Sequence, residues 1–172
     1  MLEEIIIRKA KLGDEEGIAE LTKEGLRRKN FLYTGNNQPF SKERIERMKE
    51  DLSSRNPNSY SFVAINSSNN QLVGSIIFSF MKRGRLRHRV DLGWGVHPDY
   101  QRRYIGSKLL KVALSYAKNK GFKRAEAEVS VENIASVKLA KNAGFKIEGR
   151  KRKALLTDDG RYIDTYVLGK VF

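Results

Sequence analysis

One run of the sequence, from Val90 to Leu110, gathers groups that suit the binding of a phosphate; its residues are VDLGWGVHPDYQRRYIGSKLL. The run predicts a strand, a tight proline turn, a basic loop and a helix that begins near Gly106 and Ser107. The first N–H groups of a helix lack partners within it and lie at the positive end of its dipole, so they favour a bound phosphate. Arg102 and Arg103 stand beside this helix start, and a guanidinium group matches phosphate oxygens in a fork. The run therefore predicts a pyrophosphate site.

The strand in this run has two unlike faces. One face carries the apolar side chains of Val90, Leu92, Trp94 and Val96, and the other carries Asp91, Gly93 and Gly95. Side chains alternate between the faces of a strand, so the apolar face is expected to pack on a helix. The other face offers a carboxylate and two glycines, which leaves room for a ligand to approach the backbone. The alternative is a strand beside a bulge, with the glycines selected for shape.

Composition limits the classes of protein. A chain of 172 residues with 40% hydrophobic residues suits one well-packed domain, expected over residues 1–172. No stretch approaches the roughly 20 apolar residues of a membrane helix, and the N-terminal sequence lacks the pattern of a signal peptide. Cysteine is absent and only two histidines occur, so a disulfide, a thiolate site or another metal site is not expected. We expect a cytoplasmic protein with no membrane partner, either a monomer or a homodimer.

The charge of the chain is strongly positive. It holds 34 Lys and Arg against 20 Asp and Glu, a formal net charge of +14. Such a field attracts nucleic acid, acidic headgroups or a phosphorylated cofactor, and it repels polyamines. The alternative is a lysine-rich, solvated surface of the kind that heat adaptation produces. Two basic clusters, Lys82–Arg89 and Arg150–Lys153, fall at expected turns or strand ends, where they are solvated or else hold CoA phosphate, an acidic peptide or RNA.

Hydrophobic periodicity and turn residues divide the rest of the chain. Asp14 and Ser41 are placed to cap two helices, while Gly121 and Gly144 are placed to end two more. Expected strands are 5–11, 60–65, 72–83, 90–96, 125–131, 145–156 and 161–172, and expected helices are 15–28, 42–54, 105–120 and 132–145. The helical connection between strands 90–96 and 125–131 has the length of a crossover, so these two strands are expected to be parallel.

This order of elements and its motifs resemble the GNAT superfamily of acyl-CoA-dependent N-acetyltransferases. The family signature is Gln or Arg, two residues, Gly, one residue, then Gly or Ala, and it corresponds to Gln101–Gly106, with Tyr104 where glycine is usual. The later segment NIASVKLAKNAGFKIEGRKR is similar to the subgroup that includes ribosomal-protein N-terminal acetyltransferases, as is the ending DGRYIDTYVLGK. The resemblance implies a mixed, mostly antiparallel α/β sheet of seven strands, with a central splayed parallel pair and about four flanking helices.

The resemblance also implies acetyl-CoA as co-substrate and a set of residues that bind it. The pyrophosphate would lie on the loop and helix start formed by Gln101, Arg102, Arg103, Tyr104, Ile105, Gly106 and Ser107. The pantetheine arm would lie against the strand at Trp94, Gly95 and Val96. Asn133 would hydrogen-bond the amides of that arm, and it is equally suited to cap the following helix.

Acyl transfer to an amine needs a deprotonated amine, a donor to the oxyanion and a proton for the departing thiolate. Asp91 stands where many family members carry a glutamate base, which would act through water; alternatively, it pairs with Arg87 or Arg89. His97 is a second candidate base, although a turn histidine before proline is more often structural. A backbone N–H near Val96 would hold the oxyanion.

The proton donor to the thiolate differs from that of many relatives. The position of their tyrosine acid is Ala140, so Ser136, at the serine position of the ribosomal-protein subgroup, is the preferred donor. A surface helix serine is the alternative. Tyr166 is a further candidate, although an aromatic residue in a closing strand usually packs.

The acceptor is expected to be a primary amine, preferably a protein N-terminus or a ribosome-associated substrate. The first two helices and their loop would shape its pocket, with Leu26, Phe31, Tyr33 and Phe40 as lining candidates or as core residues. A small-molecule amine acetyltransferase and a CoA- or nucleic-acid-binding protein without transferase activity are the rival interpretations. Ribosome or RNA association would use the basic surface.

Overall fold

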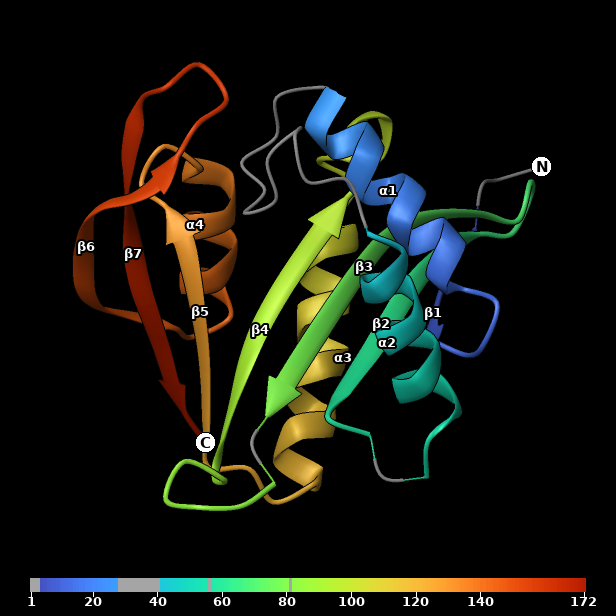
Figure 1. Cartoon of the computed structure of the whole chain (residues 1–172), viewed down its shortest axis with the longest axis horizontal. Coiled ribbons are helices and arrows are strands. Elements are labelled where there is room, and N and C mark those ends of the chain that lie inside the picture. The colour runs from blue at the N-terminus through green and yellow to red at the C-terminus, as the bar shows by residue number, and fades with distance from the viewer. Residues whose placement is uncertain (1–3, 28–40, 56, 81) are drawn as a thin grey trace.

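Seven strands form one twisted sheet in which a single neighbouring pair runs parallel. The structure, a computed structural model, describes residues 4–27, 41–55, 57–80 and 82–172. The strands are β1 (Ile5–Lys9), β2 (Ser59–Asn66), β3 (Gln71–Phe80), β4 (Arg89–Val96), β5 (Arg124–Ser130), β6 (Lys146–Leu156) and β7 (Tyr162–Val171). Their order across the sheet is β1-β2-β3-β4-β5-β7-β6 (Figure 1). β4 and β5 are parallel and all other pairs are antiparallel, so the expected sheet is confirmed.

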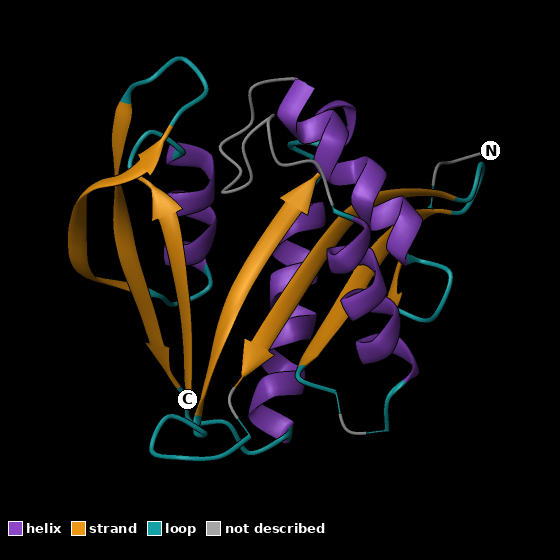
Figure 2. Ribbon diagram, viewed as in Figure 1, coloured by secondary structure: helices purple, strands orange, loops and turns teal. Residues whose placement is uncertain are grey.

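Four α-helices cover this sheet in the part of the chain that the structure describes. They are α1 (Glu15–Arg27), α2 (Lys42–Ser53), α3 (Ile105–Asn119) and α4 (Ile134–Asn142), and a short 3-10 helix, η1, spans Pro98–Tyr100. α1 and α2 lie on one face, over β3 and its neighbours, while α3 lies on the opposite face (Figure 2). None of the described helices has the length and apolarity needed to cross a bilayer.

The parallel pair separates soon after it forms. β4 and β5 pair only over Arg89–Asp91 and Arg124–Glu126, and the two strands then diverge toward the carboxyl end of β4 (Figure 1). On its other side β4 stays paired with β3 without a register shift, from Val90 to Val96. The expected splayed pair is therefore present. The β3–β4 register is continuous along the glycines of β4, while β3 has a register shift on its other side, against β2.

The helix ends follow local rules with one exception. Ser41 caps α2 by accepting a hydrogen bond from the Arg44 amide, and Gly121 and Gly144 take the positive φ angles that end α3 and α4. Asp14 was expected to cap α1 through its side chain. Instead, its carboxylate accepts hydrogen bonds from the Arg8 guanidinium and the Lys11 amide, because β1 brings Arg8 alongside.

The main core lies between the sheet and α3. α3 buries residues at helical spacing, namely Ile105, Leu109, Leu110, Ala113, Leu114 and Ala117. Leu109 packs so closely on β3 that a Cβ added to Gly74 would lie 3.0 Å from one of its methyl groups. The fit fixes the distance between α3 and the strands that carry the site.

We predict that Leu109→Ala lowers the free energy of unfolding by about 2 to 5 kcal/mol, because it leaves a cavity in a tightly packed core. Denaturant unfolding followed by circular dichroism measures the change. Leu156→Ala is the matched control, since this side chain is 64% exposed and its loss should cost about 0.5 kcal/mol or less. Equal effects of the two substitutions would contradict this account of the core.

Candidate active site

The loop that the sequence predicts to bind phosphate joins η1 to α3 and has an unusual backbone. Arg102 and Tyr104 both adopt positive φ angles, of 59° and 60°, with Arg103 between them outside that region. Alternation of this kind turns successive N–H groups toward one side, which makes a concave site for an anion. The guanidinium of Arg103 lies over the ring of Tyr100, 4.9 Å from its centroid. The loop thus presents both oriented amides and positive charge.

α3 continues this anion site. Its first intrahelical bond runs from the Lys108 amide to the Tyr104 carbonyl, so the amides of Ile105, Gly106 and Ser107 precede the hydrogen-bonded turn. A Cβ added to Gly106 would lie 3.1 Å from a methyl group of Leu139, on α4. Glycine at this position therefore lets α3 and α4 pack closely at the phosphate site.

A cavity of about 500 Å³ lies between the diverging strands and beneath α1 and α2. All residues of β4 from Asp91 to Val96 line it, together with residues of β3 and β5. A Cβ added to Gly93 or Gly95 would meet nothing within 4 Å, so both glycines open onto free space. The side of β4 that was expected to receive a ligand is indeed open.

The backbone of β4 also faces this gap. The His97 amide donates to the Val73 carbonyl on β3, at 2.8 Å. Because the groups of successive strand residues point in opposite directions, the amides of Trp94 and Val96 point toward the side from which β5 has separated. The donor proposed near Val96 therefore has the direction that an oxyanion hole requires.

Ser136 and Asn133, on the first turn of α4, lie at the far wall of the same cavity. The indole N–H of Trp94 donates to the Ser136 hydroxyl at 3.3 Å, which leaves the hydroxyl hydrogen to be donated elsewhere. Asn133 caps α4, since its side-chain oxygen accepts from the Ser136 amide at 3.0 Å. Its NH₂ group is not used in this cap, so capping and contact with a ligand are compatible.

Asp91 lies at the closed end of the cavity, at the last paired position of β4 and β5. Partial burial raises the pKa of its carboxyl group, and the neighbouring Glu126 carboxylate raises it further, while Arg89 acts in the opposite direction. The ion pair of Arg89 is with Glu126, at 3.0 Å, and not with Asp91 as the alternative had it. Among the described residues, no guanidinium group bonds directly to Asp91, and its raised pKa makes the carboxylate a stronger base.

The other residues considered for proton transfer make capping or packing contacts. The ring nitrogen of His97 accepts a hydrogen bond from the Asp99 amide, and its ring packs edge-on against Tyr100. Tyr166 packs against the main core, and Ala140 is fully buried in it. His97 and Tyr166 therefore make the capping and packing contacts that were their alternatives, and their roles in proton transfer stay predictions.

Two charged residues of the cavity were missed by the sequence reasoning. Glu128 enters it from β5, and Arg44 enters it from α2. The alternation of AEAEVSV places Glu126 and Glu128 on one face of β5, and this pattern was a signal that could have indicated Glu128.

Of the expected acceptor residues, Leu26 is half-buried on α1. Phe31, Tyr33 and Phe40 lie outside the described residues.

A second cavity, of about 550 Å³, lies between α3, α4 and the end of β7. It begins beside the phosphate loop at Ser107, and Lys111, Lys118 and Lys170 contribute positive charge to its lining. Among the described residues, no group of His, Asp or Glu side chains is arranged to hold a metal ion.

The two basic clusters differ in their environment. Residues of the β3–β4 turn, including Arg83, Arg85 and Arg87, are exposed. In the second cluster, Arg150 pairs with Asp164 at 2.7 Å and Lys151 pairs with Glu128 at 2.6 Å. The second cluster is therefore partly neutralised, which the sequence alone did not indicate.

Comparison with known proteins agrees with this geometry. The sequence pattern of the Acetyltransferase (GNAT) family matches residues 25–145. The chain belongs to this family. It is 31% identical over 101 residues to the L-amino acid N-acetyltransferase AaaT of Escherichia coli (strain K12), a match that covers 58% of this chain and 62% of the relative.

Solved structures of GNAT proteins have the same fold. The GNAT-family acetyltransferase from Streptococcus pneumoniae superposes with a TM-score of 0.87, at 26% identity, over 98% of this chain and 100% of its own. A phosphinothricin acetyltransferase from Sinorhizobium meliloti, in complex with AcCoA, gives a TM-score of 0.84 at 20% identity, over 98% of this chain and 88% of its own. The GNAT fold expected from the sequence is thus confirmed.

Tyr104 is the departure of this GNAT protein from the family signature, and the structure explains how it is tolerated. The residue takes the left-handed conformation that glycine adopts without strain, and its ring is 78% exposed. The side chain therefore points to solvent while the backbone keeps the shape of the loop.

We predict that Tyr104→Gly changes the Kd for acetyl-CoA by less than about threefold, because the backbone shape is preserved. Relief of left-handed strain, about 1 to 2 kcal/mol, is largely offset by the greater chain entropy of glycine. Tyr104→Val should weaken binding and lower the melting temperature, since a β-branched residue resists this conformation. Isothermal titration calorimetry and thermal melts measure both variants. A large loss of affinity in Tyr104→Gly would show that the phenol ring itself binds the ligand.

Proposed function

We propose that this GNAT protein transfers the acetyl group of acetyl-CoA to the α-amino group of an amino acid or of a peptide N-terminus. The observation that carries the proposal is the cavity between β4 and β5, which is open at Gly93 and Gly95 and lined by Asp91 and Ser136. Family membership and the acetyl-CoA complex of a structural relative support the same co-substrate.

Acetyl-CoA would lie across the open edge of β4. Its pyrophosphate would occupy the loop and helix start from Gln101 to Ser107, where left-handed backbone and helix amides suit an anion. The pantetheine arm would pass along Trp94–Val96 and reach Asn133. The lysines of the second cavity, which begins at Ser107, suit the phosphate-bearing nucleotide end.

The acceptor amine would approach from the α1 and α2 side of the cavity. Asp91 would take a proton from the ammonium group through water, and the free amine would attack the thioester carbon. The Val96 amide would stabilise the oxyanion of the tetrahedral adduct. As the C–S bond breaks, the Ser136 hydroxyl would donate its proton to the thiolate and take the extra proton from the adduct nitrogen, so CoA leaves as a thiol and the amide is neutral. No metal is needed for this sequence of steps.

The charges of the cavity favour an α-amine next to a polar or anionic group. Asp91 and Glu128 suit an ammonium group, and Arg44 suits a carboxylate. The likeness to an L-amino acid N-acetyltransferase supports a free amino acid. The likeness of the α4–β6 segment to ribosomal-protein acetyltransferases supports a protein N-terminus. Both sources present the same reacting group.

We predict that thiol release from acetyl-CoA depends on an added α-amine. The assay compares free L-amino acids, their C-terminal amides and short peptides with the same first residue. Faster turnover of a free amino acid than of its amide assigns the free amino acid, and preference for the peptide assigns a protein N-terminus. Binding of acetyl-CoA without turnover of any amine would overturn the proposal.

We further predict that Asp91→Asn lowers kcat about 10²- to 10⁴-fold, the usual contribution of a general base, with little change in the Kd for acetyl-CoA. Ser136→Ala should also lower kcat, whereas Ser53→Ala, at an exposed serine of α2 that lines neither cavity, is the control. Steady-state kinetics and calorimetry separate the two effects. Unchanged rate and pH dependence in Asp91→Asn would remove the base assignment.

Association with RNA or the ribosome stays a prediction, as does the choice between monomer and homodimer. The exposed arginines of the β3–β4 turn support association with RNA, because such groups bind phosphate backbones in a salt-dependent way. The pairing of Arg150 and Lys151 with carboxylates removes support from the second cluster. A polyanion partner would therefore contact the β3–β4 turn.

A further inference from the structure

Two carboxyl groups lie side by side at the point where β4 and β5 part. Asp91 and Glu126 are partners in the last pair of the parallel register, so their side chains lie on the same face of the sheet. Asp91 lines the cavity. The Glu126 side chain is only 16% exposed. One carboxyl thus faces the substrate space and the other stands directly behind it.

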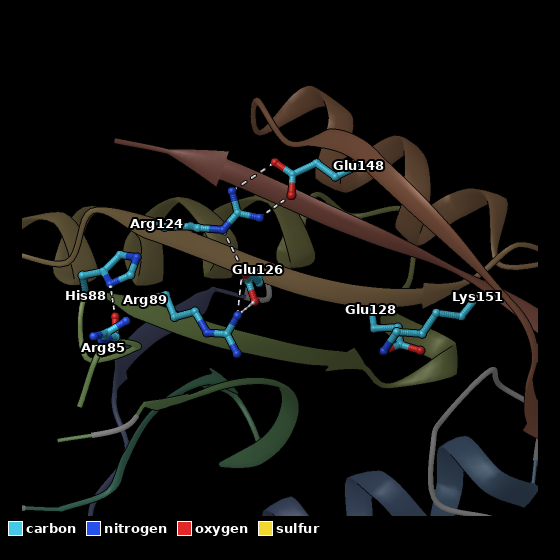
Figure 3. A network of polar contacts seen from close by, with 8 residues as sticks. All are labelled: Arg85, His88, Arg89, Arg124, Glu126, Glu128, Glu148 and Lys151. Atoms are coloured by element: carbon cyan, nitrogen blue, oxygen red, sulfur yellow. Dashed lines mark hydrogen bonds and ion pairs between the residues drawn. The ribbon is translucent and has the colours of Figure 1, made fainter. Parts of the chain in front are cut away.

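Glu126 is held by two guanidinium groups from neighbouring strand positions. Arg89, on β4, donates from Nη1 to Oε1 of Glu126 at 3.3 Å and lies 3.0 Å from Oε2 as an ion pair. Arg124, on β5, donates from Nε to Oε1 at 2.6 Å. Arg124 also binds Glu148 of β6 through both of its Nη atoms. The result is a chain of alternating charges, Arg89–Glu126–Arg124–Glu148, across three strands (Figure 3).

Among the described residues, few other charges face Asp91. Arg89 precedes it on the same face of β4, and Glu126 and Glu128 lie on β5. From the helical side, Arg44 of α2 lines the cavity, while the lining residues of α1 and β3 are uncharged. The charge of Glu128 is matched by Lys151, at 2.6 Å (Figure 3). Glu128 also accepts a hydrogen bond from Thr165.

The two nearest charges act on Asp91 in opposite directions. The Glu126 carboxylate repels the ionised form of Asp91 and accepts a hydrogen bond from its protonated form, whereas Arg89 attracts the ionised form. Burial is the largest cause that raises the pKa of Asp91, and Glu126 adds to it against Arg89. A carboxylate with the ordinary aspartate pKa of about 3.9 is a weak base toward an ammonium group.

We propose that Glu126, clamped between Arg89 and Arg124, is a positioning residue that makes Asp91 basic enough to deprotonate the acceptor amine. The proposal rests on the proposed role of Asp91. One N–H bond of the ammonium group breaks, its electron pair stays on nitrogen, and the proton passes through water to Asp91. The protonated Asp91 then donates a hydrogen bond to Glu126, and the proton later leaves to solvent.

The test is the pH profile of kcat/KM for wild type, Glu126→Gln and Arg89→Gln with one amine. In this profile, deprotonation of the substrate amine gives a change of slope, or break, at the pKa of the amine. This break is the same for all variants because it belongs to the substrate. A second break at lower pH belongs to Asp91. We expect Glu126→Gln to move it down by about one pH unit, because a repelling charge is lost, and Arg89→Gln to move it up.

Glu148→Gln is the matched control. It removes the outer carboxylate of the same charge chain, which has no direct contact with Asp91, so it should leave the break in place. Melting temperature and the Kd for acetyl-CoA are measured for each variant. If Glu126→Gln does not fold, Arg124→Gln carries the test, because it removes an ion pair from Glu126 without removing a charge that acts directly on Asp91, and it should move the break up.

The outcomes separate this inference from the proposed function. Loss of the low-pH break in Asp91→Asn, with no shift in Glu126→Gln or Arg89→Gln, would overturn the role of Glu126 and keep that of Asp91. Shifts of both variants in the same direction would also overturn it. A low-pH break that persists in Asp91→Asn would overturn the base assignment itself.

Discussion

β4 and β5 share a ladder only from Arg89 to Asp91, and this early end of the parallel pairing creates the site. Beyond it, the amides of Trp94 and Val96 point into a gap. A buried amide without a partner costs about 1 to 3 kcal/mol. A ligand that carries its own carbonyl groups therefore gains by entering the gap. An extended chain of amides, such as the pantetheine arm of acetyl-CoA, suits this requirement.

Different forces fix the two ends of the gap. At the closed end, the chain of ion pairs from Arg89 to Glu148 ties β4, β5 and β6 together. At the open end, α3 and α4 approach closely where Gly106 meets Leu139. Behind β4, aromatic rings of β2, β3 and α3 pack against one another, including Tyr60, Phe78 and Tyr116. These rings support the strands on the α3 side of the sheet.

The electrostatics of the site differ from those of the whole chain. A net charge of +14 produces a field that attracts an anionic nucleotide. Asp91 and Glu128 nevertheless place carboxylates where the amine is proposed to bind. Over short distances these fixed groups dominate, because screening by salt weakens the contribution of remote surface charges. A basic protein can therefore hold a cation-binding pocket.

Sequence by itself determined the elements and the phosphate-binding loop, because both depend on neighbouring residues. Hydrophobic periodicity set the helices, and Gly121 and Gly144 set their ends. The alternation around Gly93 and Gly95 indicated an open strand face. Tertiary structure alone decided that β7 lies between β5 and β6. It also decided that Arg89 pairs with Glu126 and not with Asp91. The ion pairs of Asp14 with Arg8 and of Lys151 with Glu128 likewise depend on the tertiary structure. These contacts join residues from different elements, and their partners depend on strand order and register, which no local pattern records.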